Sequence, residues 1–212
     1  LETLKLEKEK LKLEQEKLQL EKEKLKLETE KNKATQANPQ VASPFPFVRL
    51  RKNVALIGLC SALPQPLHKA AGLLGAMQLE SIATLLRDLR ERGYYRCVLI
   101  HHPPLPGLAP PRKALADAAG FRDVLAAEGA ELVLHGHNHA YGLVALPSRF
   151  GTVNVVGVPS ASMGESLHRE PAAWHRYAIA RRDGLWHTSL AVRTWNPENR
   201  AIRTTAEFAL SH

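Results

Sequence analysis

The sequence contains only two cysteines, Cys60 and Cys97, and each lies within an apolar run. A thiol in such a run usually packs as a small hydrophobic group, so we expect no disulfide and a reducing, cytoplasmic compartment. No apolar run approaches the roughly 18 residues that a membrane-crossing helix needs, and charges interrupt every leucine pair near the N-terminus. These absences argue against a secreted disulfide scaffold, a signal peptide and a membrane partner.

Aromatic residues are also scarce, at 6% of the sequence, and this bears on the net charge of +8. In residues 1–33 lysine and glutamate nearly cancel, so the excess comes mostly from arginines scattered through the later part of the chain. No known nucleic-acid-binding pattern and no interleaved aromatic residues accompany them. We therefore expect a solvated basic surface and no nucleic-acid partner.

Residues 1–33 are a low-complexity segment of leucine, lysine and glutamate with a seven-residue period. Its leucines lie two positions apart and would form two stripes roughly 160° from one another on a helix, which disfavours a simple leucine zipper. Glutamates placed three residues before lysines, as at Glu7 and Lys10, favour a long charged helix. Such a helix is either a spacer or a coiled-coil-like element that self-associates through its two stripes.

The prolines of residues 34–47 predict a linker, after which the composition changes to alanine, arginine, valine and glycine. Residues 48–212 then form the third segment, for which the sequence predicts an α/β domain with a β-rich tail. Helical spacing of apolar residues predicts helices from about 79 to 93 and from 113 to 128. Apolar runs predict strands at about 54–59, 96–100, 131–134, 142–147, 152–158, 174–181 and 185–195.

Two histidine clusters directly follow predicted strands: Val98-Leu-Ile-His101-His102, and His135-Gly-His137-Asn-His139. An extended backbone would point His137 and His139 to the same side, toward one metal ion or two adjacent ions. Imidazole suits divalent transition metals, so His101, His137 and His139 are the candidate ligands. For His102 and His135 a supporting role at the rim of the site is the better interpretation.

These clusters match the VxxH and GHxH signatures and so resemble the last two motifs of the calcineurin-like metallophosphoesterases. The similarity runs from about Phe45 to Trp195, and FPFVRLRKNVALIGL and VVGVPSAS resemble the bacterial cyclic-nucleotide phosphodiesterase branch. The resemblance implies part of a four-layer α/β/β/α sandwich. It also implies a site for two ions of Mn, Fe or Zn, in which His101 and His137 share one ion and His139 binds the other.

The chain departs from the family pattern in its acidic ligands. The family also uses DxH, GDxxD and GNHD motifs before VxxH, whereas the first aspartate here is Asp88 and the first histidine is His68. A carboxylate that bridges two ions offsets their mutual repulsion, and neutral imidazoles do not replace it. We therefore expect at most one ion, and exposed apolar surface where the rest of such a sandwich would pack.

Two functions remain open at this point. One is a metal-dependent phosphoester hydrolase that acts on a small-molecule phosphoester, incomplete on its own or completed by another chain. The other is a non-catalytic interaction protein, a truncated or fused pseudoenzyme with a helical extension.

Overall fold

The computed structural model describes residues 19, 45–66, 69–163, 170–196 and 198–212. By its internal contacts the chain divides into Leu1–Ser43 and Pro44–His212, and all elements below belong to the second unit. The predicted helix 1–33, apart from Gln19, and most of the predicted linker lie outside the described residues. The helix and its self-association therefore stay predictions.

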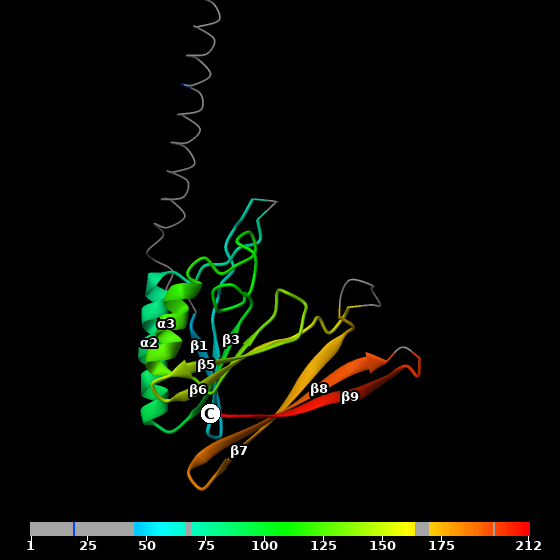
Figure 1. The fold of residues 1–212 in the computed structure, drawn as a ribbon. Coiled ribbons are helices and arrows are strands. Elements are labelled where there is room, and N and C mark those ends of the chain that lie inside the picture. The colour runs from blue at the N-terminus through cyan, green and yellow to red at the C-terminus, as the bar shows by residue number, and fades with distance from the viewer. Residues whose placement is uncertain (1–18, 20–44, 67–68, 164–169, 197) are drawn as a thin grey trace, which may run out of the picture. The chain divides into compact units, whose positions relative to one another are not determined.

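The second unit contains two sheets and two helices (Figure 1). In chain order the elements are β1 (Phe47–Arg51), β2 (Val54–Gly58), α2 (Ala76–Glu91), β3 (Tyr95–Ile100), α3 (Ala118–Glu128), β4 (Leu132–His135), β5 (Gly142–Ser148), β6 (Gly151–Gly157), β7 (Ala173–Arg182), β8 (Leu185–Asn196) and β9 (Ala201–Leu210). The larger sheet has the order β1-β2-β3-β4-β6-β5, and the smaller one has the order β7-β8-β9. In the larger sheet β2, β3, β4 and β6 run parallel, while β1 and β5 are antiparallel edge strands.

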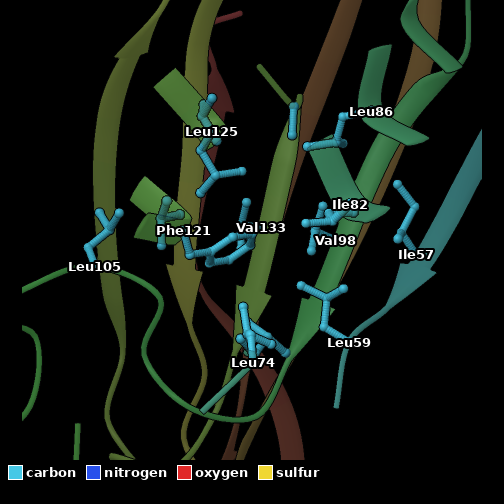
Figure 2. Close-up of a cluster of buried hydrophobic side chains, with 14 of the residues drawn as sticks. Ile57, Leu59, Leu74, Ile82, Leu86, Val98, Leu105, Phe121, Leu125 and Val133 are labelled. Carbon is cyan, nitrogen blue, oxygen red and sulfur yellow. The ribbon is translucent and has the colours of Figure 1, made fainter. Parts of the chain in front are cut away.

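Both helices cover one face of the larger sheet, where they bury most of the core (Figure 2). Successive side chains of a strand point to opposite faces, so Val98 and Ile100 of β3 face the helices. They meet apolar side chains that recur at helical spacing on α2 and α3, among them Ile82, Leu86, Phe121 and Leu125.

The smaller sheet packs against the opposite face of the larger one. Tyr95 and Cys97, which alternate with Val98, contact Leu190 of β8 and Leu210 of β9 in a second apolar cluster. The Tyr95 ring also meets the edge of Trp186, with ring centroids 5.3 Å apart. The described part of the chain is thus a helix layer followed by two sheet layers.

The predicted α/β class is confirmed, and the strands predicted between residues 54 and 195 all form. Three elements differ from the prediction. Strand β1 begins at Phe47, the last residue of the predicted linker, and β9 follows the predicted β-rich tail. Helix α3 begins at Ala118 and not near Lys113, because the backbone of residues 112–116 pairs instead with that of residues 70–72.

The expected apolar exposure is present at several aromatic and aliphatic side chains of the described strands. Exposed examples are Phe47 on β1, Trp174 on β7, and Trp195 and Ile202 on β8 and β9. Within the described residues, no helix combines the length and apolarity needed to cross a bilayer.

Candidate metal centre

The candidate histidines lie at one edge of the larger sheet, where the four parallel strands end. His101 and His102 follow β3, and His135 ends β4, opposite Ile100 in the register of the two strands. The backbone N–H of Gly136 donates to the carbonyl oxygen of His101 at 3.1 Å, which ties the two loops together. Because parallel strands end at the same edge, the topology brings residues 35 positions apart into contact.

The imidazoles of His101 and His137 form the centre of this cluster. His101 Nε2 lies 3.0 Å from His137 Nδ1, and the ring planes are nearly perpendicular. One nitrogen of the pair is a donor and the other an acceptor in the neutral state. These two rings are the pair for which the family resemblance implies a shared ion.

His102 is buried behind this pair and has both nitrogens occupied. Its Nδ1 lies 2.8 Å from Ser61 Oγ, and its Nε2 lies 3.1 Å from the carbonyl oxygen of Ala70. Since a carbonyl only accepts, Nε2 carries the proton and Nδ1 accepts from the serine hydroxyl. Burial lowers the pKa of His102, which favours this neutral form. The ring packs 4.5 Å from that of His137, and a Cβ on Gly72 would overlap it.

His137 has no partner for its second nitrogen. Nε2 is buried and makes no hydrogen bond within the described part of the chain. The pKa of His137 is lowered to about 4, first by burial and then by nearby His102, His101, Lys113 and His139. All of these neighbours are cationic or can become so, and no acidic group contributes.

The backbone after β4 differs from the extended form that the alternation argument assumes. His137 and His139 both adopt left-handed conformations, with φ of 68° and 55°. His139 is exposed and makes no hydrogen bond within the described residues. The expected extended backbone is therefore not present at His137 and His139. The structure brings His101 and His137 together, and His139 as a metal ligand stays a prediction.

His135 is buried at the end of β4. Its Nδ1 lies 3.2 Å from the carbonyl oxygen of Gly136, and burial lowers its pKa. A Cβ on Gly157 would lie 2.9 Å from a carbon of the His135 ring, so glycine is needed at that position of β6. This packing fits the supporting role predicted for His135.

The nitrogen donors of His101 and His137 fit part of a coordination site for one metal ion. In the described residues no group of three or more His, Cys, Asp or Glu side chains is placed to hold a metal. Two nitrogens bound to one tetrahedral Zn²⁺ lie roughly 3.3 Å apart, so the 3.0 Å between His101 and His137 suits two ligand positions of a single ion. Without a carboxylate, the described residues do not fit a two-ion centre.

The sequence prediction did not include Ser61 or Lys113 in the site. Ser61 follows the end of β2 at the same sheet edge, so a polar residue just after a parallel strand was the available signal. Lys113 lies in the segment before α3, where the helix was predicted to begin, and its nearness to His137 had no local signature.

No family model matches the chain, and the search of curated proteins found no match. Among solved structures the chain is similar to a dimetal phosphatase from Danio rerio, at 14% sequence identity and a TM-score of 0.49. The likeness covers 66% of this chain and 39% of that one, so the chain spans about two fifths of that protein's length. A likeness of this size carries no argument about what the chain binds or does.

Proposed function

We propose that residues 45–212 carry the histidine side of a metal-dependent phosphoester hydrolase. The 3.0 Å approach of His101 Nε2 to His137 Nδ1 at the carboxyl edge of the parallel strands is the observation that carries this proposal. The VxxH and GHxH signatures support it, because the resemblance implies one ion shared by these two residues.

In this proposal His101 and His137 hold the ion, and His102 positions His137 through its own contacts with Ser61 and Ala70. Imidazole ligands alone favour Zn²⁺ over the harder Mn²⁺. A bound ion would supply Lewis acidity to a phosphoryl oxygen. His139 and carboxylates from another polypeptide would complete the second position of a two-ion hydrolase, which would act on a small-molecule phosphoester in the cytoplasm.

Zn²⁺ binding tests the proposal directly, with the metal-free full chain titrated in a calorimeter. His101→Ala and His137→Ala should each weaken binding by more than about tenfold, because each removes a donor. His187→Ala, an exposed histidine on β8, is the matched control and should leave the affinity unchanged. Equal affinity in all four proteins would refute the proposed site.

Among the described residues no acidic side chain acts on His137, and this favours a second candidate, a non-catalytic pseudoenzyme. The same proteins distinguish the two when given Zn²⁺ or Mn²⁺ and an aryl phosphodiester such as bis(p-nitrophenyl) phosphate. Turnover that is lost in His137→Ala indicates a hydrolase that is active in this chain and excludes the non-catalytic form. Histidine-dependent Zn²⁺ binding without turnover indicates either the non-catalytic form or a hydrolase that needs carboxylates from another polypeptide.

A further inference from the structure

Next to the histidine pair lies a hollow of about 310 Å³ on the sheet face opposite the helices. His101 and His135 form part of its wall, and the rest comes from apolar residues that include Phe47, Leu99 and Val158. A Cβ on Gly58 would overlap the Phe47 ring, so glycine at this position allows the ring to pack against β2. The hollow thus opens beside the proposed ligand His101.

A second hollow of about 410 Å³ continues from the first. The two share Leu134 and Val158, and the second extends to Trp174, His175 and Tyr177 of β7. We call the two together the apolar groove. Each volume falls within the range of about 300–1,000 Å³ that small-molecule sites occupy.

The side chains that line the apolar groove are mostly apolar and carry no permanent charge. Its described lining residues include no Asp, Glu, Lys or Arg. His175 Nδ1 and the Tyr177 hydroxyl lie 3.1 Å apart and satisfy each other, which leaves His175 Nε2 as an unpaired polar atom at the far end. Recognition of a nucleobase or a sugar needs several polar groups placed around it, and this lining does not supply them.

The end of the groove at the histidine pair has the opposite character. His101 lines this end and hydrogen-bonds with His137, and the His102 ring packs against that of His137. Imidazole donors with no carboxylate among the described lining residues suit an anionic group. A ligand that spans both parts is therefore an anion attached to an apolar body.

We propose that the site takes phosphoesters of apolar alcohols, with the phosphate at His101 and His137 and the alkyl or aryl group in the apolar groove. This rests on the proposed function for the hydrolytic step, but binding of the apolar group does not require hydrolysis. It narrows the substrate class away from nucleotides and sugar phosphates.

Binding by the metal-free full chain tests the proposal, with inorganic phosphate, methyl, butyl and hexyl phosphate, phenyl phosphate and AMP as probes. Each buried methylene contributes enough transfer free energy to raise the affinity about fourfold. The affinity should therefore rise steeply from methyl to hexyl phosphate, and AMP should bind no better than methyl phosphate. An affinity that is flat across the alkyl series, or highest for AMP, overturns the proposal.

Val158 is the position to change, because it lines both hollows and is only partly buried. Val158→Trp should fill the junction and weaken hexyl phosphate at least tenfold, while the affinity for inorganic phosphate stays the same. Leu185→Trp, at the first residue of β8, which is 67% exposed, is the matched control and should have no effect.

Val158→Thr keeps the shape of valine and places a hydroxyl in the apolar groove, so it tests the proposal even if the tryptophan variant does not fold. It should weaken hexyl phosphate several-fold and leave inorganic phosphate unchanged. If both variants fold and bind hexyl phosphate with unchanged affinity, the proposal that the apolar groove binds the alkyl group is overturned. If alkyl-dependent binding holds but Zn²⁺ does not bind to His101 and His137, the groove stands and the hydrolase proposal fails.

Discussion

The two edges of the larger sheet differ in how fully the polar atoms of Arg96 and His137 are paired. At the edge where the parallel strands begin, Arg96 is only 2% exposed and meets the Glu131 carboxylate with two side-chain hydrogen bonds, of 3.0 and 2.7 Å. Its remaining donors reach the carbonyl oxygens of Glu128 and Leu86. At the edge where the strands end, the imidazole of His137 hydrogen-bonds with that of His101 and packs against that of His102, and its buried Nε2 has no hydrogen-bond partner in the described residues.

The difference separates a group that stabilises the fold from one that does not. A charge that is buried and fully paired keeps the unit together, because removing one partner leaves the other uncompensated. A buried polar atom without a partner costs stability. In His137 this atom is Nε2, whereas the proposed ion would bind Nδ1, so the unpartnered Nε2 shows that His137 is a poor stabiliser of the fold and does not mark the ligand atom. The Arg96 edge therefore stabilises the fold, and the His137 edge is the candidate functional site.

Glu131→Ala should give the largest effect on stability, because it leaves the Arg96 guanidinium buried without its counterion. We expect a loss of about 3–5 kcal/mol in the free energy of unfolding, measured by urea denaturation at pH 7. Asp123→Ala breaks the exposed pair with Arg122 and is the matched control, with an expected change within about 0.5 kcal/mol. Equal losses in the two variants would mean that burial does not distinguish these ion pairs.

Glu128 offers a smaller and pH-dependent test of the same edge. Hydrogen bonds from Arg87, and next from Arg90, hold the pKa of this carboxyl below its ordinary value of 4.5. A carboxyl whose pKa is lowered by folding stabilises the fold above its unfolded pKa, and this contribution disappears as the pH falls through the folded pKa.

Glu128→Gln should therefore be destabilised relative to the original chain at pH 7, by less than Glu131→Ala. The difference in the free energy of unfolding between Glu128→Gln and the original chain should disappear as the pH drops below about 4.5, where the original carboxyl takes up its proton. Urea midpoints measured from pH 7 to pH 3 provide the readout. A gap that stays constant over this range would show that the carboxylate charge contributes nothing.

The central part of the fold could be predicted from the sequence, because its elements have strong local patterns. Buried parallel strands such as β3 read as continuous apolar runs, and α2 repeats leucines at helical spacing up to Gly93. The edge strands β1 and β9 alternate basic or polar residues with apolar ones over short stretches, and β1 follows a proline-rich segment. Each pairs with its neighbour in the chain, β1 with β2 and β9 with β8, but neither has the continuous apolar run that identified the other strands.

The site was predicted in part for a related reason. Parallel topology puts the residues after β3 and β4 at one edge, so proximity of His101 and His137 follows from the strand pattern. The left-handed turns at His137 and His139 depend on how the loop leaves β4 and crosses toward β5. Histidine, like asparagine, is enriched in this conformation, but most histidines do not adopt it, so the residue types of His135-Gly-His-Asn-His139 permit these turns without predicting them.

The smallest expected effect on stability is also the sharpest test of the comparison, and it concerns His137. Its left-handed backbone and its unpartnered Nε2 both cost free energy in the metal-free protein. His137→Gly removes both costs and loses the hydrogen bond with His101 and the packing against the His102 ring. Asp183→Gly, at φ 50° in the turn between β7 and β8, relieves the same kind of backbone strain without a buried unpaired nitrogen. Because both glycines add similar entropy to the unfolded chain, the difference between the two variants isolates the side-chain contribution.

We expect His137→Gly to be as stable as Asp183→Gly or more stable by up to about 1 kcal/mol, while only His137→Gly loses the rise in melting temperature on adding Zn²⁺. A His137→Gly variant less stable than Asp183→Gly by more than about 1 kcal/mol would show that this histidine stabilises the fold, and the contrast between the two sheet edges would then not hold.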